Sequence, residues 1–458
     1  MTYLKVNDVT VREFALLIKG GEHCSIDCHS ISASAFDWLM TNGVGSGEGQ
    51  QELVRVKRHG KAVALQVVNF VGVLETPCFT RIEILPKTSN DASNPEEARK
   101  ILLKMLAAVD NLKLQQFEQS QLQVLKQPLY ELLIWHFLQA LVKLIRQGIQ
   151  SEYQRVDRQA PFLKGQLQLD KQINQRPGRQ HYFHVSHDVY SQDRAENRLL
   201  HAALKQVLKW STSNANQRLA RELLFVFHGI KESSNFALDF RAWKDDRSIA
   251  HYRPLRPWCE LILSYQSPVA MVGNHKGLSF LFPMEQLFER YVAKKLASSM
   301  PNGLRLRTQI ASHSLVTHND EKWFKLKPDI VVYDQNRVVT VIDTKWKLLE
   351  QNQDNSRQKY NLSQADMYQL FAYGEKYLQG KGEIYLIYPK HTRFSDALAS
   401  FEYHQSLKLR IVPYDLDSDV CGVLFQCGQT LGGKLLTYRN ISFNFFDKLT
   451  KAPFRSSK

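Results

Sequence analysis

The sequence predicts a multidomain α+β protein: a β-rich N-terminal domain over residues 1–90, a mainly helical middle region over 91–265, and a C-terminal α/β domain with a mixed sheet over 266–458. A length of 458 residues allows roughly two to four domains, each able to bury its own core. Short β-branched runs dominate the first part, and apolar residues at helical spacing dominate the second. Helices and strands then alternate towards the C-terminus.

The N-terminal domain is predicted to be built from short strands. Leu53–Val56 alternates apolar and polar residues, and the runs 70–74 and 80–85 are typical of the two strands of a hairpin. The basic stretch Arg55–Lys61 lies on or beside one strand. It is either a contact for DNA or a partner, or an ordinary solvated face.

The middle region shows helical periodicity from about residue 95 to about residue 230. Leu129 to Ile145 carries apolar residues at helical spacing, and residues 194–210 are also predicted to be helical. One interruption, 161–170, is typical of a turn and a short strand, and 182–190 has an extended pattern.

A β-hairpin is predicted around residues 327–347. The β-branched runs 330–333 and 338–342 flank the polar segment 334–337, a pattern of strand, tight turn and strand. Asp329 and Asp343 are equidistant from Asn336, so the hairpin places them opposite each other on one face. Period-two alternation returns Lys345 to the same face.

Two carboxylates and an ammonium group at one end of a ribbon suit phosphodiester hydrolysis. Carboxylate oxygens are ligands that Mg²⁺ prefers, and Mn²⁺ is expected to substitute for it. A nearby lysine can orient the attacking water and stabilise charge on the phosphate. The motif Pro328-Asp329 followed by Asp343-Thr344-Lys345 resembles the PD-(D/E)xK nuclease superfamily, which implies that the C-terminal domain is a nuclease domain. The structural alternative is a surface hairpin whose Asp and Lys residues form an ordinary salt bridge.

Two flanking helices are predicted to complete this site. Glu289 lies on a helix predicted over 284–297; a Glu from such a helix usually joins the metal site in the superfamily, although it could simply pair with Arg290 or Lys294. Gln369 and Tyr373 are four residues apart on a helix predicted to start at a capping box, Ser363 to Asp366. This pair resembles the accessory motif of RecB-like members of the superfamily.

Charge and composition restrict the partners and the compartment. The net charge of +15 and a pI near 9.4 favour a polyanionic partner, and DNA is the one expected. No apolar run is long enough to span a bilayer, so no membrane partner is expected. The first residues do not have the pattern of a signal peptide, and six scattered cysteines suit a reducing cytoplasm. No motif for nucleotide hydrolysis is present, so no nucleotide is expected to bind this chain itself.

Several segments together resemble the McrC family. They are Phe70–Val73, Ile82–Lys87, Phe162–Gln166, Asp193–Arg198 and the hairpin motif. McrC proteins are the endonuclease subunits of McrBC modified-cytosine-specific restriction systems. The resemblance implies that Asp329, Asp343 and Lys345 form the nuclease triad. It also implies a partner: a separate, McrB-like AAA+ GTPase ring recognises modified DNA and translocates, and the McrC-type subunit docks on that ring, here through residues 1–90, stimulates hydrolysis and cuts.

Three functional hypotheses follow. The first is a Mg²⁺-dependent DNA endonuclease subunit of a modification-dependent restriction system. The second is a non-catalytic adaptor that activates a motor NTPase, in which the hairpin is only structural. The third is a stand-alone nuclease of repair or defence that needs no motor.

Overall fold

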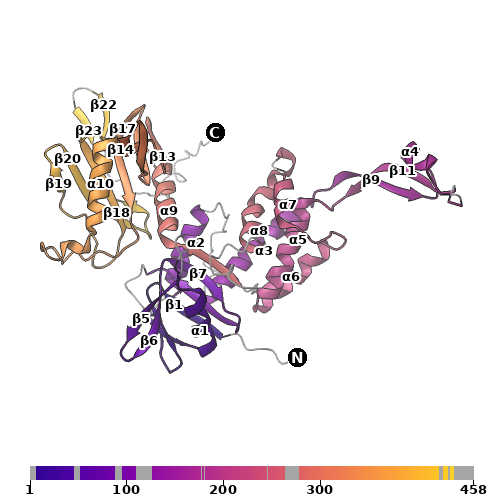
Figure 1. The fold of residues 1–458 in the computed structure, drawn as a ribbon, viewed down its shortest axis with the longest axis horizontal. Helices are drawn as coiled ribbons and strands as arrows, with labels where there is room; N and C mark the ends of the chain where they lie inside the picture. Colours follow the sequence, from indigo (N-terminus) through magenta and orange to yellow (C-terminus); the bar gives the residue numbers. More distant parts are fainter. Residues whose placement is uncertain are drawn as a thin grey trace, which may run out of the picture. The chain divides into compact units, whose positions relative to one another are not determined.

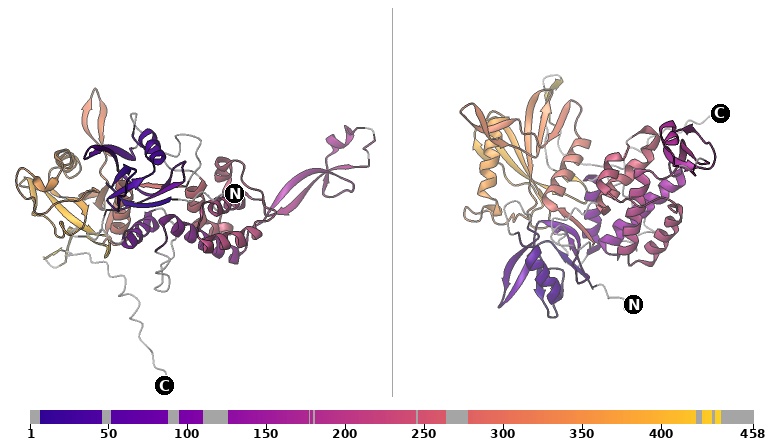
Figure 2. Two further views of the ribbon diagram at one scale, coloured as in Figure 1. Left: turned by 90° about the horizontal axis from the view of Figure 1, so that it is seen from below. Right: turned by 45° about the vertical axis from the view of Figure 1, so that its right-hand side comes forward.

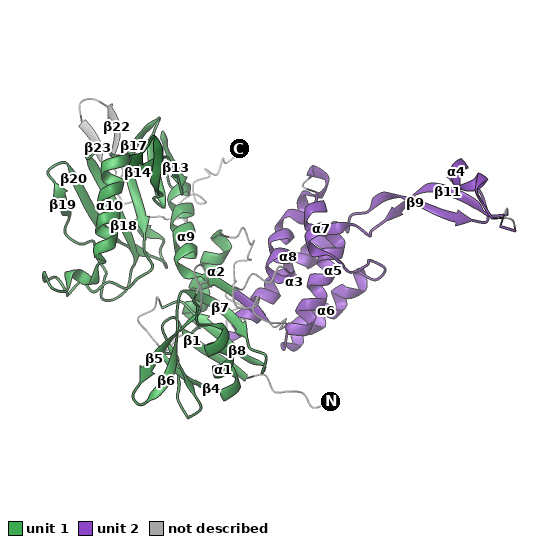
Figure 3. Cartoon of the chain, in the orientation of Figure 1, with its two compact units in different colours: residues 1–110, 281–458 green, residues 111–280 purple. Residues whose placement is uncertain are grey.

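The structure is a computed structural model that describes residues 7–45, 52–87, 95–109, 126–263 except 177, 180 and 245, and 278–421, together with the backbone of 426–431 and 434–437. The chain divides into two compact units (Figure 3). Unit 1 comprises residues 1–110 and 281–458, and unit 2 comprises residues 111–280. The predicted domain boundaries at 90/91 and 265/266 lie outside the described residues, so the division into three domains stays a prediction.

Two small sheets form the N-terminal part of unit 1. One has the strand order β3-β4-β2-β6-β5 and the other β1-β8-β7-β12. Their strands are β1 (Asn7–Arg12), β2 (Leu16–Lys19), β3 (Cys24–Ser25), β4 (Cys28–Ile31), β5 (Val54–His59), β6 (Ala62–Val67), β7 (Phe70–Glu75), β8 (Thr80–Leu85) and β12 (Ser279–Pro283). The predicted hairpin of β7 and β8 is confirmed, and every residue of both strands is buried. Helix α1 (Ala33–Asn42) accompanies these strands.

Helix α2 (Pro95–Val109) is joined to this sheet by buried charge. Glu96 and Glu97 lie in its first turn, where the helix dipole favours acids. Arg99 donates hydrogen bonds to both carboxylate oxygens of Glu83 on β8, at 2.8 and 2.7 Å. Because both side chains are buried, removing either partner would leave an uncompensated charge in the core.

The C-terminal part of unit 1 is a seven-stranded mixed sheet in the order β13-β16-β17-β18-β20-β19, with β21 paired to β20 (Figure 1). Its strands are β13 (Leu304–Thr308), β16 (Ile330–Asp334), β17 (Arg337–Thr344), β18 (Gly382–Pro389), β19 (Phe401–His404), β20 (Leu407–Asp415) and β21 (Val420–Cys421). Strands β17, β18 and β20 are parallel, whereas β13, β16 and β17 are antiparallel. The predicted mixed sheet is therefore present.

Helices cover both faces of this sheet. Helix α10 (Gln364–Tyr377) packs on the face that carries Val331 and Val341. A side chain at Gly374 would lie 2.6 Å from Leu407, so only glycine lets the helix pack this closely. Helix α9 (Met284–Ser298) covers the other face, where the Phe288 ring contacts the Trp346 ring at 5.1 Å.

Unit 2 is a helical bundle with one projecting arm. Its helices are α3 (Leu129–Gln147), α5 (Ala195–Trp210), α6 (Asn214–Val226), α7 (Phe236–Ala242), η2 (Arg247–Leu255) and α8 (Arg256–Leu263). We call residues 152–191 the arm: β9 (Glu152–Ala160), β10 (Gln166–Leu167), α4 (Leu169–Ile173) and β11 (Phe183–Ser191). Figures 1 and 2 show it extending away from the helices.

In the arm, the prediction of helix for residues 152–160 is wrong, and Gly165 occupies a turn that needs a glycine. Residues 152–160, assigned to the helical pattern, form β9, which pairs antiparallel with β11 over nine residues. The strand was missed because it is exposed and polar, without apolar alternation. A side chain at Gly165 would lie 2.4 Å from the Ser186 carbonyl oxygen, so this turn needs a glycine.

Within the described ranges, every helix is too short or too polar to cross a bilayer.

A buried glutamate connects the N-terminal strands to the C-terminal sheet. Glu13 follows β1, and its Oε2 accepts a hydrogen bond from the Trp346 indole nitrogen at 2.8 Å. Trp346 follows β17 by two residues, so this contact lies beside the predicted catalytic hairpin. Burial raises the pKa of Glu13 to about 8, although the Trp346 hydrogen bond opposes the shift.

The raised pKa of Glu13 predicts a pH-dependent stability that Glu13→Gln removes. The unfolded chain releases this proton near pH 4.5 and the folded chain near pH 8, so the wild type loses stability across that interval as pH rises. At about pH 8.5 the neutral variant should therefore have the higher unfolding midpoint and a free energy of unfolding larger by at most about 5 kcal/mol, with no advantage near pH 4.5. Thermal unfolding at both pH values measures this, with exposed Glu22→Gln as control. A constant difference between variant and wild type would contradict it.

Candidate active site

The register of β16 and β17 brings the two predicted acids level with each other. Ile330 pairs with Ile342, and continuing the register by one residue places Asp329 opposite Asp343. The turn itself is shorter than predicted, because Asp334 and Arg337 still pair. A two-residue turn alone would put Asp329 one position out of step. A bulge between Val332 and Tyr333 restores the pairing.

The two carboxylates have different surroundings. Oδ2 of Asp329 accepts two hydrogen bonds from Thr344, from its backbone nitrogen and from its hydroxyl, both at 2.8 Å. Asp343 is 1% exposed, and its Oδ2 lies 2.8 Å from the Lys345 ammonium. Asp329, Asp343 and Lys345 share the face on which α10 packs, as the alternation with Val331 and Val341 requires.

Burial raises the pKa of both acids to about 6. The second cause is a neighbouring acid in each case: Glu289 raises the pKa of Asp329, and Asp329 raises the pKa of Asp343. Lys345 acts in the opposite direction on both carboxyls. The pair is therefore an electrostatically strained site that an added positive charge would relieve.

Lys345 is held as a cation. Burial alone would lower its pKa, but Asp343 and Asp329 outweigh burial and raise it. Its backbone nitrogen donates to Ile387 on β18 at 2.9 Å, which fixes the chain just beyond β17. The ammonium group is suited to stabilising negative charge rather than to accepting a proton.

Glu289 on α9 reaches the same site through Gln309. The Gln309 amide nitrogen donates to Oε1 of Glu289 and lies 3.5 Å from Oδ1 of Asp329. The Gln309 backbone nitrogen also donates to the Asp329 carbonyl at 2.9 Å. The structure thus brings Glu289 beside Asp329, and Gln309 is a member of the site that the sequence did not indicate.

Helix α10 contributes the predicted accessory pair. The Gln369 amide donates to the Tyr373 hydroxyl at 2.5 Å, and that hydroxyl donates to the Lys327 carbonyl at 3.1 Å. This contact fixes the chain two residues before Asp329. Asp343 and Asp329 both raise the pKa of Tyr373 after burial, which places its hydroxyl within the field of the site.

The predicted capping box at Ser363 is wrong, and Asp366 acts on the carboxylate site instead. Ser363 makes no side-chain cap hydrogen bond to α10. Asp366 instead raises the pKa of both Asp343 and Lys345. Asp366 therefore acts electrostatically on the site, from a helix that starts 20 residues after Thr344 in the sequence.

The oxygen atoms of the site suit a hard divalent cation. Oδ2 of Asp343 is buried, and its contact within the described structure is the ion pair with the Lys345 ammonium at 2.8 Å. Among the described residues, the contact of Asp329 Oδ1 is the long one to Gln309, at 3.5 Å. As they stand, the described His, Cys, Asp and Glu side chains include no group of three close enough to hold a metal. The Gln309 amide contacts both Glu289 and Asp329, so it would have to move before these two carboxylates could share a cation.

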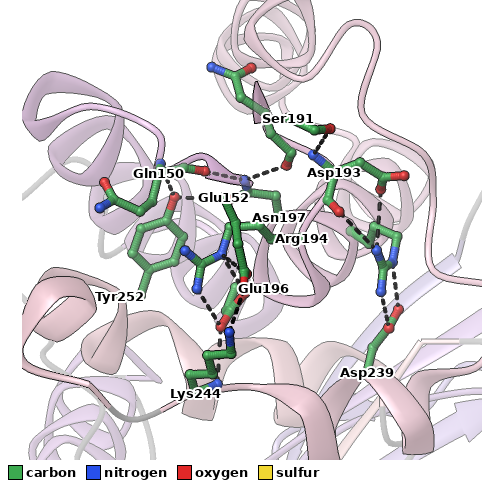
Figure 4. Close-up of polar contacts among 12 residues, drawn as sticks. Gln150, Glu152, Ser191, Asp193, Arg194, Glu196, Asn197, Asp239, Lys244 and Tyr252 are labelled. Carbon is green, nitrogen blue, oxygen red and sulfur yellow. Dashed lines mark hydrogen bonds and ion pairs between the residues drawn. The ribbon is translucent and has the colours of Figure 1, made fainter. Parts of the chain in front are cut away.

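A second polar cluster lies at the root of the arm (Figure 4). Asn197 on α5 donates to the carbonyls of Gln150 and Gln192, at 3.0 and 2.7 Å, and so ties together the two chain segments that enter and leave the arm. The Tyr252 hydroxyl donates to Asn197 at 2.9 Å. Arg198 donates to Asp239 at 2.6 Å. The motif 193–198 therefore fixes the arm to the bundle, and its role is structural.

The fold and the site define a multidomain α+β protein with a paired-acid and lysine site at the end of a mixed-sheet hairpin. The model of the family described as McrBC 5-methylcytosine restriction system component matches residues 65–389. The match includes all six predicted site residues. The chain belongs to this family of restriction system components.

One solved structure has a similar fold over most of the chain. A chain in the structure of Thermococcus gammatolerans McrB AAA+ hexamers with bound McrC, a half-complex of a tetradecameric assembly, matches with a TM-score of 0.65 and 20% identity, covering 89% of this chain and 95% of that one. A chain of the T. gammatolerans McrBC complex matches with 21% identity, covering 65% and 89%, but its TM-score of 0.49 is too low to support a comparison. Among curated proteins, none matches this sequence.

The shared field of the carboxylates predicts that Asp329→Asn stabilises the fold. The pKa of Asp329 rises from 3.8 to about 6 on folding, so the wild type loses stability as pH rises through that interval. The neutral amide avoids the loss. The unfolding midpoint of the variant should exceed that of the wild type above pH 6, and the two should converge near pH 4. Exposed Asp354→Asn is the control, and a lower midpoint for Asp329→Asn at high pH would count against the strained pair.

Proposed function

We propose that this chain is a Mg²⁺-dependent DNA endonuclease subunit of a modification-dependent restriction system, with a PD-(D/E)xK nuclease domain at its C-terminus. The observation that carries the proposal is the pair Asp329 and Asp343, both with raised pKa, beside a cationic Lys345. Titratable groups whose pKa values are shifted by burial and by specific charged neighbours are typical of catalytic sites when they gather in one cluster. Membership of the McrBC family supports this assignment.

Asp329, Asp343 and Glu289 would hold the metal. Mg²⁺, or Mn²⁺ in its place, supplies a Lewis acid that polarises the phosphate and lowers the pKa of a water. The buried Oδ2 of Asp343, whose contact at 2.8 Å is with the Lys345 ammonium, would supply one ligand. Gln309 would have to release Glu289 when the metal binds.

The remaining residues position and stabilise. Lys345 stays protonated, so it orients the nucleophilic water and stabilises negative charge developing on the phosphate. Gln369 and Tyr373 hold the chain before Asp329 through the Lys327 carbonyl. Asp366 helps to keep Lys345 charged.

The partner is a ring-forming AAA+ GTPase that selects modified DNA, while this chain binds no nucleotide. The similar T. gammatolerans structure contains McrB hexamers with bound McrC, which supports such a partner here. Two surfaces are candidates for the contact: the N-terminal residues 1–90 and the arm. The arm carries strongly exposed apolar side chains, including Leu169 and Ile173 on one face of α4, and such exposure marks interaction sites.

The rival functions make different demands on the site. A non-catalytic adaptor needs neither the carboxylate pair nor a metal, so the buried and electrostatically costly Asp343 would have no purpose. A stand-alone nuclease needs the site but no exposed arm. The combination of both features favours the motor-dependent endonuclease.

Asp343→Ala should abolish cleavage of modified DNA by the complex while leaving folding and ring binding nearly intact. Loss of even an outer partner of a metal ligand costs about 10- to 100-fold, so loss of a ligand should cost more than about 100-fold. Nicking and linearisation of methylated plasmid, with Mg²⁺ or EDTA, measure this, and Asp354→Ala is a matched surface control. Full-rate cutting by Asp343→Ala, or by the wild type in EDTA, would sink the proposal. Cutting by the isolated chain without nucleotide would instead favour the stand-alone nuclease.

If the ring docks on the arm, the double variant Leu169→Ser with Ile173→Ser should co-purify less well with the GTPase. It should also stimulate GTP hydrolysis less. We expect binding to weaken by about tenfold or more, because each large apolar contact is worth over 1 kcal/mol. The matched control is Leu238→Ser with Phe225→Ser on the bundle: the exposed fractions are 63% and 80% in the arm against 60% and 81% in the control. Val56→Ser with Val63→Ser tests the N-terminal surface. If only this last pair loses binding, docking lies in residues 1–90 and not in the arm.

A further inference from the structure

A basic groove leads away from the acidic site. It has a volume of about 920 Å³ and lies between α9 and β13. Its cationic lining residues are Arg290 and Lys294 from α9, Arg307 from β13 and Lys327 from the loop before β16. All four are exposed. Outside the carboxylate site, these positive side chains dominate the groove.

The groove and the carboxylate site share residues. Glu289 and Gln309 line the groove and also make the contacts that reach Asp329. Lys327 lines it too, and its carbonyl accepts the Tyr373 hydroxyl hydrogen bond of the site. A polyanion lying along the cations would therefore pass the catalytic acids.

A two-stranded hairpin adjoins the same groove. Strands β14 (His313–His318) and β15 (Glu321–Leu326) connect β13 to β16 and form a sheet of their own, which projects from unit 1 (Figure 2, left). Its two turn residues, Asn319 and Asp320, both have positive φ, as the tightest hairpin turns require. The hairpin is thus a stiff ribbon rather than a loose loop.

The base of the hairpin is fixed to helix α10. The Tyr377 hydroxyl on α10 bonds to the carbonyls of Ile310 and Leu326, at 2.8 and 2.9 Å, one on each side of the ribbon. The His313 ring lies 4.5 Å from the Tyr377 ring. Because α10 also carries Gln369 and Tyr373, one helix positions both the ribbon and the site.

The outer part of the ribbon has the surface of a ligand contact. Leu315, Val316, Trp323 and Phe324 are each at least 41% exposed, and Lys322 and Lys325 are interleaved with them. Phe324 has a φ of 55°, a conformation that costs energy for a bulky residue, and yet its ring is 69% exposed. Folding alone gains nothing from holding an aromatic ring in that way.

We propose that duplex DNA is the occupant of this surface: the groove takes the phosphate backbone along Lys294 and Arg307, and the β14–β15 ribbon lies against the duplex beside the cut. This inference rests on the proposed nuclease function. Charge decides the occupant, because a run of cations ending at a metal-ligating site matches a polyanion. The form of the ribbon agrees, since the DNA major groove admits a two-stranded β-ribbon.

The test measures DNA binding without cleavage. The full-length chain carrying Asp343→Ala is titrated against a fluorescein-labelled duplex of about 30 base pairs, and affinity is followed by anisotropy from about 50 to 200 mM KCl. Lys294→Ala with Arg307→Ala probes the groove, and Lys322→Ala with Lys325→Ala probes the ribbon. Each pair should weaken binding and reduce the slope of log affinity against log salt by about 2, one for each phosphate contact. The control, Arg218→Ala with Arg221→Ala, removes the same charge from the exposed face of helix α6 in unit 2 and should leave the slope unchanged.

The aromatic part of the ribbon has its own readout. Trp323→Ala with Phe324→Ala should weaken binding several-fold with little change of slope, because apolar and stacking contacts release few counterions. Unchanged affinity and slope in both ribbon variants would overturn the assignment of the ribbon. Ribbon variants that bind DNA normally but lose the GTPase ring would assign it to a protein partner and overturn the proposal as well.

The proposed DNA path and the proposed nuclease activity can each be wrong while the other holds. If the wild-type complex cuts DNA but neither the groove nor the ribbon variants alter binding, only the DNA path is wrong. If those variants lose binding as described while the wild-type complex never cuts, the DNA path stands and the catalytic proposal is wrong.

Discussion

Two carboxylates brought together on one hairpin are the constraint on which the candidate active site depends. Asp329 and Asp343 lie opposite each other, both largely removed from water, and each has a pKa near 6 because burial and neighbouring acids oppose ionisation. The fold tolerates the pair because Lys345 lies 2.8 Å from Asp343 and Thr344 donates two hydrogen bonds to Asp329. A site of this kind is costly to keep without a cation, and that cost is the physical reason for proposing metal-assisted chemistry there.

The rest of unit 1 is arranged around that hairpin. Helix α9 brings Glu289 through Gln309, and α10 brings Tyr373 and Asp366. The N-terminal strands reach it as well, since Glu13 accepts the Trp346 hydrogen bond one residue after Lys345. Segments more than 300 residues apart in sequence therefore meet at one short stretch of chain, so a change in the N-terminal part can alter the site without touching DNA.

The sequence predicted the local elements better than their meeting points. The helix at 284–298 and the hairpin at 330–344 follow from periodicity, and both were predicted. The pairing of Asp329 with Asp343 was also predicted, but from a symmetric turn; the real turn is shorter, and a bulge compensates for it. Gln309 and Asp366 could not have been found in this way, because only tertiary packing brings them to the site. Strand β9 was missed because a projecting polar hairpin has no apolar pattern to reveal it.

Direct binding of a metal tests the central claim most simply, because it needs neither the partner nor DNA. Mn²⁺ is titrated into the full-length chain and followed by the loss of its free electron paramagnetic resonance signal, for the wild type, Asp343→Asn and the surface control Asp354→Asn. The wild type and the control should bind Mn²⁺ alike and release it to excess Mg²⁺, whereas Asp343→Asn should bind at least about tenfold more weakly. Equal binding by Asp343→Asn, or no competition by Mg²⁺, would contradict a metal site at the paired carboxylates.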